Sequence, residues 1–491
     1  MSGEQFDVIV VGAGSAGLPC AILAAERGAR VAVIESSSEI GGTLHVAGGH
    51  LSAAGTRRQQ ERGIQDTPDD HYADVIRINR GTSDPTLVRL AVDHAAATVD
   101  WLDDLGYRQH PDSPQRSVIL APYLVERVHW GESGVQSGPD ILRALRPAWE
   151  RQVAAGRIEL LLGHSLTGLA CEDGAIAGVR VEGPAGALTV YGDSVVLATG
   201  GYGASPKLFR ELTPGAPDVL GLAPPANTGG GIVAAREVGG SVVGADRFLV
   251  AYGIMEESPG SERGASRLNG IDLRPERARR EIWVNQDGER FVAEDGQSIV
   301  KQHAALLVQP GQRAWLILDA AALRDGQSVH LHWDAAGLRR AALEGRQAWS
   351  ADAPAELARL AGIAPAGLER TLAAWNAATA AAATGSDELG RTSGLVPLAE
   401  PPYVAVLMRI GVMLSFGGLA VDDELRVLGE GDVPIPGLYA AGEILGAAQT
   451  SGKSYTGGMQ LTPALTFGRL LGERLGEAAA RRAAPTPTPG S

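Results

Sequence analysis

Cysteine is scarce in this chain. Among 491 residues only Cys20 and Cys171 are cysteines, and they form neither a CxxC pair nor a metal-ligand spacing. Isolated thiols of this kind exclude a disulfide framework, and the absence of CxxCH excludes covalently attached c-type haem. The sequence therefore predicts no metal site. Because a chain without disulfides is typical of a reducing compartment, it also predicts a cytoplasmic location.

Positive charge and long apolar runs are also lacking. The 43 Lys and Arg residues are outnumbered by 57 Asp and Glu, which gives a net charge of −14. This balance argues against nucleic acid or an anionic membrane surface as a partner. No apolar run reaches the roughly 18 residues that a transmembrane helix needs. The N-terminus is polar and its first apolar run, Val8 to Val11, has the length of a strand, so no secretory signal is expected.

Aromatic residues make up only 5% of the chain, whereas glycine is abundant. The chain has 65 glycines among its 491 residues, well above the average glycine usage of roughly 7%. This excess indicates many tight turns or close backbone approaches. The length exceeds what one hydrophobic core usually serves, so two domains are expected. The Ala-, Pro- and Thr-rich residues 484–491 are predicted to be a disordered tail.

The N-terminal sequence FDVIVVGAGSAGLPCAILAAERGARVAVIES has the pattern strand, glycine turn, helix, strand. In GxGxxG, the first glycine permits the turn, the second admits a pyrophosphate, and the third lets helix and strand pack closely. Glu35 ends the second strand, about 20 residues further on, where a carboxylate can bind ribose hydroxyls. The predicted cofactor contacts here are Gly12, Gly14, Ser15, Ala16, Gly17, Glu35 and Ser36.

Further glycine clusters favour FAD over NAD. One follows Glu35 closely, a second follows the predicted strand from Ser194 to Ala198, and a third follows the strand in PIPGLYAAGE. Separated glycine sites that follow strands fit one long cofactor threaded through the domain. The further predicted FAD contacts are Gly42, Thr43, Ala47, Gly48, Gly49, Thr199, Gly200, Gly442, Glu443, Gly458, Met459 and Leu461.

The segments GGTLHVAGGHLSAAGT, SDPTLVRLAVDHAAATVDWLDDLG, DGERFVAE, ATGG and IPGLYAAGE resemble the fumarate reductase/succinate dehydrogenase flavoprotein superfamily, in the same order. The resemblance covers nearly the whole chain. It implies an α/β fold: a discontinuous Rossmann-like FAD-binding domain with an inserted α+β capping domain. The expected boundaries are 1–243 and 395–483 for the FAD-binding domain and 244–394 for the cap, with the active site between them.

The resemblance also bears on how FAD is held. Superfamily members that attach FAD covalently use a histidine just ahead of the second glycine pair. Counting back from Gly48 and Gly49 places Gly42 at that position, and His45 lies nearby but out of register. Non-covalent FAD is therefore expected.

Three positions argue against a dicarboxylate substrate. Fumarate reductases clamp their substrate with arginine and histidine, because guanidinium–carboxylate pairs fix both ends of it. At the corresponding positions this chain has Ser298, Leu414 and Tyr455. A hydroxyl, an apolar side chain and a phenol have replaced the charged groups.

The stretch GKSYTGGMQL resembles the matching turn of the 3-ketosteroid dehydrogenases, in which a tyrosine and a nearby backbone N–H polarise the substrate ketone. The resemblance gives Tyr455 this role, with a backbone N–H near Gly458 or Met459. Such donors stabilise the enolate charge that forms when a proton leaves the carbon α to a carbonyl. The expected activity is FAD-dependent α,β-desaturation of an alicyclic or steroid-like ketone, with hydride transfer to flavin N5.

Two alternatives stay open at this point. The same residues could serve an enone or enoate reductase acting on a non-dicarboxylate alkene. A non-catalytic or tRNA-modifying flavoprotein is also possible, but the chain has no basic stripe for RNA. The base is equally open, because ketosteroid dehydrogenases have a tyrosine where Ser298 stands and a serine is a poor base. The candidates are Ser298, His50, Tyr252, Tyr123 and His129. The sequence identifies neither the electron acceptor nor the oligomeric state.

Overall fold

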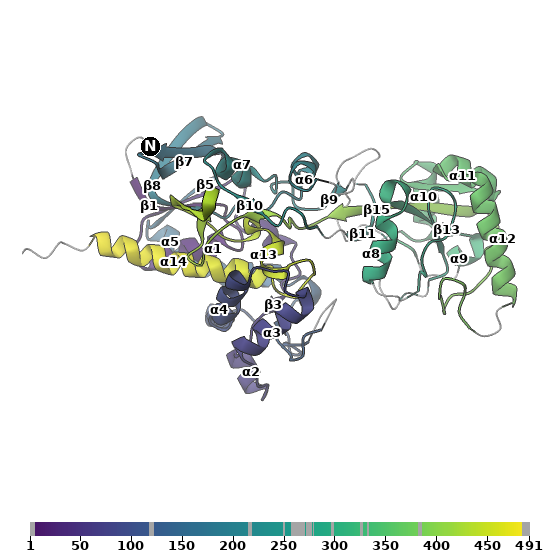
Figure 1. The fold of residues 1–491 in the computed structure, drawn as a ribbon, viewed down its shortest axis with the longest axis horizontal. Helices are drawn as coiled ribbons and strands as arrows, with labels where there is room; N and C mark the ends of the chain where they lie inside the picture. The colour runs from purple at the N-terminus through teal and green to yellow at the C-terminus, as the bar shows by residue number, and fades with distance from the viewer. Residues whose placement is uncertain are drawn as a thin grey trace, which may run out of the picture. The chain divides into compact units, whose positions relative to one another are not determined.

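The computed structural model (Figure 1) describes residues 5–116, 122–214, 219–248, 251–256, 271, 277, 279–295, 299–324, 328–330, 333–381 and 385–483. Ser298 and the predicted tail, 484–491, lie outside the described residues. The chain divides into two compact units. Unit 1 comprises Met1–Pro214, Pro224–Leu249 and Leu414–Ser491, and unit 2 comprises Gly215–Ala223 and Val250–Met413.

Unit 1 is built on an eight-stranded, mainly parallel sheet. Its central strand, β1, lies between β2 and β8 and runs parallel to both. Val8, Ile9 and Val10 are fully buried, as expected for a parallel strand covered on both faces. The strand order is β17 (Arg426–Leu428), β18 (Pro434–Ala440), β8 (Gly186–Leu197), β1 (Gln5–Val11), β2 (Val31–Glu35) and β5 (Ile158–Leu162), with β6 (Ser165–Glu172) and β7 (Ala175–Gly183) attached through β8.

Two helices of unit 1, α1 (Gly17–Glu26) and α14 (Leu461–Ala483), pack closely against each other (Figure 1). The reason is a row of glycines on α14. A Cβ added at Gly472 would lie 2.5 Å from the carbonyl oxygen of Cys20, one at Gly468 2.1 Å from that of Ala16, and one at Gly476 3.0 Å from Ala24 Cα. The other helices are α2 (Arg57–Glu61), α3 (Pro68–Asn79), α4 (Pro85–Asp104), α5 (Gly138–Ala154), α6 (Pro206–Leu212), α7 (Gly230–Glu237) and α13 (Ala447–Ser451).

Short elements complete unit 1. The strand pairs are β3 (Leu51–Ser52) with β4 (Val128–His129), and β10 (Val242–Val243) with β16 (Gly418–Leu419). The 3₁₀ turns are η1 (Gly42–His45), η2 (Gly134–Gln136), η5 (Glu430–Asp432) and η6 (Glu443–Leu445).

Unit 2 is a six-stranded sheet flanked by helices. The strand β15 (Tyr403–Val412) is central and pairs antiparallel with β11 (Ala251–Ile254), β13 (Arg313–Leu318) and β14 (Ala348–Ala351). The remaining strands are β12 (Ile282–Val284), antiparallel to β13, and β9 (Leu220–Gly221), parallel to β15. Its helices are α8 (Ile299–Leu307), α9 (Ala320–Arg324), α10 (Ala335–Leu343), α11 (Pro354–Ala361) and α12 (Pro365–Ala381), with the 3₁₀ turn η4 (Pro310–Gln312).

Together the two units confirm the expected fold class, a parallel-sheet FAD-binding fold accompanied by an α+β unit. Unit 2 reaches Met413 because β15 pairs with β13, whereas the sequence assigned residues 403–412 to the FAD-binding domain. In the described part of the chain, no helix has both the length and the apolarity of a membrane span.

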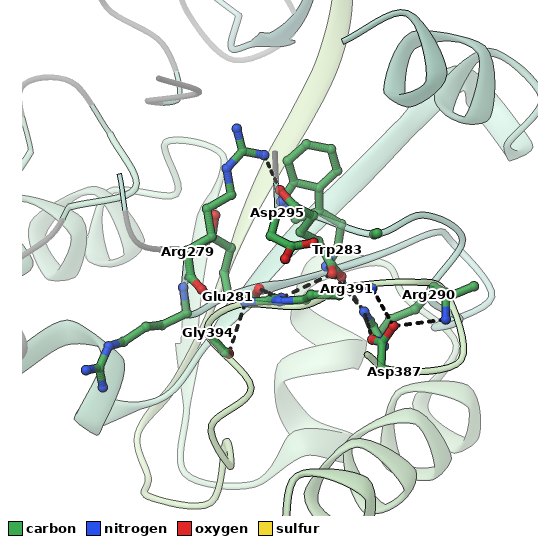
Figure 2. A network of polar contacts seen from close by, with 12 residues as sticks. Arg279, Glu281, Trp283, Arg290, Asp295, Asp387, Arg391 and Gly394 are labelled. Carbon is green, nitrogen blue, oxygen red and sulfur yellow. Dashed lines mark hydrogen bonds and ion pairs between the residues drawn. The ribbon is translucent and has the colours of Figure 1, made fainter. Parts of the chain in front are cut away.

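A buried ion network holds part of unit 2 together (Figure 2). The fully buried Glu294 carboxylate accepts from Arg290 Nε (2.9 Å) and Nη2 (2.7 Å), from Arg391 Nη1 (3.1 Å) and from the Trp283 N–H (2.9 Å). Arg290 also pairs with Asp387 at 2.7 Å. These bonds tie residues 281–294, which contain the DGERF turn, to residues 387–394.

Candidate active site

The first glycine turn has the geometry that a pyrophosphate needs. Gly12 has φ +103°, and a Cβ there would lie 2.3 Å from the Ala198 carbonyl oxygen. A Cβ at Gly17 would lie 1.8 Å from the Gly12 carbonyl oxygen, so helix and strand touch through glycine. At Gly14, in contrast, a Cβ would meet no atom within 4 Å. The turn is therefore closed on the protein side and open at its second glycine.

The predicted ribose ligand ends β2 as expected. Glu35 is 6% exposed, and its two carboxylate oxygens accept from the N–H groups of Ala13 and Ser37, both at 2.8 Å. The Ser36 hydroxyl lies 3.5 Å away. The carboxylate is thus held in place at the end of the strand, next to the glycine turn.

The structure brings the second glycine cluster to the first. The Gly41 N–H donates to the Ala13 carbonyl at 2.8 Å, and a Cβ at Gly42 would lie 3.3 Å from Gly14 Cα. Thr43 follows in η1.

The end of this cluster is fixed on α5. The Gly48 carbonyl accepts from both the N–H (3.2 Å) and the hydroxyl (3.1 Å) of Ser137. The Ala47 carbonyl accepts from the Gly138 N–H at 3.1 Å. A Cβ at Gly49, which has φ +72°, would lie 2.3 Å from the Ser137 carbonyl carbon. The backbone leading to His50 is therefore rigidly supported.

The two remaining glycine clusters, at Thr199–Gly201 and at Gly442, follow β8 and β18. Because these strands are parallel, both clusters lie at the same edge of the sheet. A Cβ at Gly442 would lie 3.0 Å from Ala16 Cβ. Glu443 accepts from the Ser415 N–H at 3.0 Å, and burial raises the pKa of its carboxyl. Thr199 Oγ1 is buried and has no hydrogen-bond partner among the described residues. An orphaned hydroxyl beside Gly200 and an open Gly14 fit a bound FAD.

His45 does not reach toward this edge. Its Nε2 lies 2.9 Å from the Ile40 carbonyl oxygen and 3.8 Å from Glu39. The ring folds back over Gly41, where a Cβ would lie 2.6 Å from Nε2. In this structure the His45 ring thus contacts residues of its own loop, and non-covalent attachment of FAD stays a prediction.

The turn that carries Tyr455 rests on β3 and on Tyr123. The buried Tyr123 hydroxyl donates to the Gly457 carbonyl at 2.7 Å. Gly458 has φ +80°, and a Cβ there would lie 2.4 Å from the Ser52 nitrogen. Burial raises the pKa of Tyr123 above its usual range, with a smaller contribution from the neighbouring Tyr455. Tyr455 itself is half-buried.

Residues just after the turn form hydrogen bonds with the turn itself and with β3. The Met459 N–H donates to the Thr456 carbonyl at 3.1 Å, and Met459 is fully buried. The Ser52 N–H donates to Thr462 Oγ1 at 2.7 Å, one residue after α14 begins at Leu461. The Met459 N–H is thus already paired in this structure.

Strand alternation in the β3–β4 pair gives the direction of the His129 side chain. In the β3–β4 pair Ser52 lies opposite Val128, and Leu51 lies opposite His129. Val128 faces the turn, because a Cβ at Gly457 would lie 3.8 Å from its Cγ2. His129, the next residue of β4, therefore points to the other face of the pair. His50 directly precedes β3 and is not one of its paired residues.

His129 Nδ1 lies 2.8 Å from Gln109 Oε1, and burial lowers the pKa of His129 to about 4. Burial also lowers the pKa of His50. The Nε2 atoms of His50 and of His129 are both buried without a hydrogen-bond partner among the residues that the structure describes.

The other candidates lie elsewhere. Tyr252 belongs to β11 of unit 2, where its hydroxyl donates to Gln302 Oε1, and burial raises its pKa to about 12. Leu414 packs against Phe416 and the helix α13 in unit 1. Ser298 is not among the described residues. Unit 1 thus gathers Tyr455, His50, Tyr123 and His129. The anchoring bond of Tyr123 has no local signal in the sequence, since 334 residues separate its partners.

Known proteins resemble this chain along nearly its whole length. The family described as FAD binding domain matches residues 7–459. A probable fumarate reductase of Shewanella frigidimarina is 29% identical over 96% of this chain and 74% of that protein. A 3-oxosteroid 1-dehydrogenase of Mycolicibacterium smegmatis is 25% identical over 96% of this chain and 97% of that protein. The solved open conformation of a flavocytochrome c3 fumarate reductase has a TM-score of 0.74 at 29% identity, covering 97% of this chain and 79% of that one.

Proposed function

Since the chain belongs to the family of FAD binding domains, we propose that it uses FAD to desaturate an alicyclic or steroid-like ketone between its α and β carbons. At the level of the family it is an FAD-dependent oxidoreductase related to fumarate reductases and ketosteroid dehydrogenases, which confirms the superfamily expected from the sequence. FAD is its cofactor.

One observation carries the proposal of a ketone. Tyr455 occupies a clamp position in a turn that Tyr123 and Ser52 hold in place, and Leu414, at another clamp position, lies in an apolar cluster. A neutral phenol donates a hydrogen bond without requiring a carboxylate in return. Such a fixed donor suits the developing oxyanion of an enolate, whereas neither the Tyr455 phenol nor the Leu414 side chain can supply the positive charge that a carboxylate needs.

The proton needs an acceptor, and His50 is the candidate here, because His129, whose Nε2 is also unpartnered among the described residues, points away from the Tyr455 turn. The Nε2 of His50 is buried without a partner among the described residues, and the lowered pKa keeps the ring neutral at pH 7. A neutral imidazole within reach of the α carbon takes up its proton, while Tyr455 donates to the ketone oxygen. Bound FAD supplies the hydride acceptor for the β hydrogen. Tyr252 suits the role less well, since its hydroxyl already donates to Gln302.

Ene reduction is the second candidate. It is the same reaction in reverse and uses the same donor and proton-transfer groups. The 29% identity to a probable fumarate reductase over 96% of the chain favours it. In that case the substrate is an enone or enoate other than a dicarboxylate.

Anaerobic half-reactions test both directions. The oxidised enzyme is mixed with saturated cyclic ketones and with succinate, and the reduced enzyme with cyclic enones and with fumarate, while the flavin absorbance is followed. We expect ketones to bleach the flavin and both dicarboxylates to leave it unchanged. Recolouring by enones alone, without bleaching by ketones, would instead support the reductase. Turnover of succinate or fumarate at the rate of a good ketone would overturn both.

Non-covalent attachment has its own test. The purified protein should be yellow, and acid precipitation should release the FAD into the supernatant. Colour that stays with the protein pellet would contradict the assignment based on His45.

A further inference from the structure

Tyr455 lies in the middle of the loop 452–460, and hydrogen bonds join the two ends of this loop, which we call its neck. Helix α13 ends at Ser451 and α14 begins at Leu461. Across the neck, Thr450 Oγ1 donates to the Met459 carbonyl at 2.7 Å, and Gln460 Nε2 donates to Ser451 Oγ at 2.8 Å. The loop therefore keeps its ends together, and the position of its tip depends on what holds the two limbs.

The N-terminal limb is held by Thr82, which comes from a distant part of the chain. The Lys453 N–H donates to Thr82 Oγ1 at 2.8 Å. Gly452, with φ +62°, approaches so closely that a Cβ would lie 2.2 Å from the same oxygen. Thr82 Oγ1 in turn donates to the Asn79 carbonyl at 2.6 Å. The hydroxyl thus serves as acceptor and donor at once, which a methyl group cannot do.

Thr82 is itself well supported. Its N–H lies 3.2 Å from Asn79 Oδ1, and its carbonyl accepts from Arg247 Nη1 at 2.6 Å. Two residues later, the Asp84 N–H donates to the Gln449 carbonyl at 2.8 Å, which joins the same segment to α13. The support for the loop is thus a fixed backbone between α3 and α4.

The C-terminal limb has the counterpart already described, the bond from Tyr123 to the Gly457 carbonyl. The two anchors act at Lys453 and Gly457, so each is two residues from Tyr455. We propose that Thr82 is a positioning residue for Tyr455: its hydroxyl fixes the limb that sets the phenol against the substrate carbonyl. This inference rests on the proposed function.

The substitution Thr82→Val tests the hydroxyl, because valine keeps the shape and lacks the oxygen. Misplacing a reacting group by about 1 Å can cost a factor of a hundred, so with the second anchor intact we expect flavin reduction to slow about tenfold. Thr82→Ser keeps the hydroxyl and should restore the rate to within about twofold of the original protein. A Thr82→Ser variant as slow as Thr82→Val would overturn the proposal, because the hydroxyl would then not be the active group.

A double-mutant cycle shows whether Thr82 acts through Tyr455. In a Tyr455→Phe background, Thr82→Val should change the rate by less than about twofold, because the donor that it positions is gone. A further tenfold loss there would make the two effects independent and overturn the positioning role. If Tyr455→Phe alone keeps the full rate, the proposed function itself fails. The two failures are therefore distinguishable.

Amide hydrogen exchange at Lys453 gives a readout that does not depend on turnover. In the holoenzyme this N–H should exchange faster in Thr82→Val than in Thr82→Ser or the original protein, because its acceptor is lost. Equal exchange in all three proteins would show that the bond does not hold the loop in solution, and the proposal would fall.

Discussion

At the scale of single residues, the phenol of Tyr455 decides which chemistry the site can perform. It is half-buried, and the neighbouring Gly457 carbonyl is tied to Tyr123. A donor held in this way gains most of its value when the acceptor becomes an anion. The residue's importance should therefore appear in rates rather than in stability.

The substitution Tyr455→Phe separates these effects. Losing one oxyanion donor costs roughly a hundred- to a thousand-fold in rate, and we expect at least the lower figure for flavin reduction by a ketone. FAD should stay bound and the melting temperature should hold, because the ring remains. Tyr191→Phe, at a side chain that is 45% exposed, is the matched control and should change neither. A destabilised Tyr455→Phe variant with nearly full activity would make the phenol a scaffold group and remove the main reason for naming a ketone.

Two buried histidines make the stability depend on pH. Burial lowers the pKa of His71 well below its usual value and that of His129 to about 4. Between these values and the unfolded pKa of about 6.5, the unfolded chain binds more protons than the folded one. Stability is therefore complete above about pH 7 and falls as the pH drops through 6.5.

From pH 7.5 to 5.5 each histidine should account for roughly 1 kcal/mol of lost stability. His71→Leu should remove the contribution of His71. The free energy of unfolding in urea should therefore fall less between pH 7.5 and 5.5 for this variant than for the original protein. Asp103, whose pKa burial raises to about 6, acts in the opposite direction but in both proteins, and so cancels from the comparison. Equal slopes for the two proteins would show that His71 is not held neutral.

At the scale of elements, glycine spacing brings α14 against α1. The contacts of Gly468, Gly472 and Gly476 put the helix backbones close together, and α14 follows directly after the Tyr455 loop. The helix thus connects the glycine turn at one end of unit 1's sheet with the proposed ketone donor.

Gly472→Ala should disturb this packing. Alanine favours a helix by about 1 kcal/mol, but a Cβ 2.5 Å from the Cys20 carbonyl oxygen forces the helices apart. Overpacking costs about 1–3 kcal/mol, so a lower melting temperature is expected. Gly230→Ala in α7 is the control, because its Cβ would meet nothing nearer than 4.0 Å, and it should cause no loss. A more stable Gly472→Ala protein would show that the helices can separate without cost.

The sequence predicts those elements whose reasons are local. The first strand, the glycine turn and the strand ending at Glu35 follow from neighbouring residues, and the structure contains them with Glu35 as the last residue of β2. The support of Tyr455 does not follow in this way. Thr82 and Tyr123 stand 371 and 334 residues from their partners, and nothing in their surroundings in the sequence marks the contact. Likewise Tyr252 is a base candidate only until its bond to Gln302 is seen.

At the scale of the whole molecule, the predicted FAD contacts and the buried ion network around Glu294 belong to different units. Every predicted FAD contact, from Gly12 to Leu461, lies in unit 1, whereas Glu294 and its arginines lie in unit 2. Damage to the network should therefore spare the cofactor.

Arg391→Ala tests this separation. Arg391 is fully buried and donates to Glu294 and to the Glu281 carbonyl (2.7 Å). Removing one partner of a buried ion pair costs about 3–5 kcal/mol. Calorimetry should show a lowered transition, while the ratio of flavin to protein stays unchanged. Loss of FAD together with this transition would contradict the assignment of the cofactor to unit 1.

The control is an exposed ion pair of the same unit. Arg324 pairs with Glu400 at 2.6 Å, and both side chains are more than half exposed. Because solvent screens such pairs, Arg324→Ala should cost less than about 1 kcal/mol. An equal effect of the two substitutions would show that burial of the network contributes nothing.

The closed neck of the Tyr455 loop also bears on how such a protein can evolve. The side chains of Thr450 and Gln460 close it, and the bond of Lys453 to Thr82 comes from its backbone, so the side chains at the tip are not part of the closure. Mutations at the tip can then accumulate without first being compensated elsewhere. A laboratory library randomised at residues 453–455, which are exposed or half-buried, should therefore consist largely of folded, yellow proteins that differ in the molecules they accept.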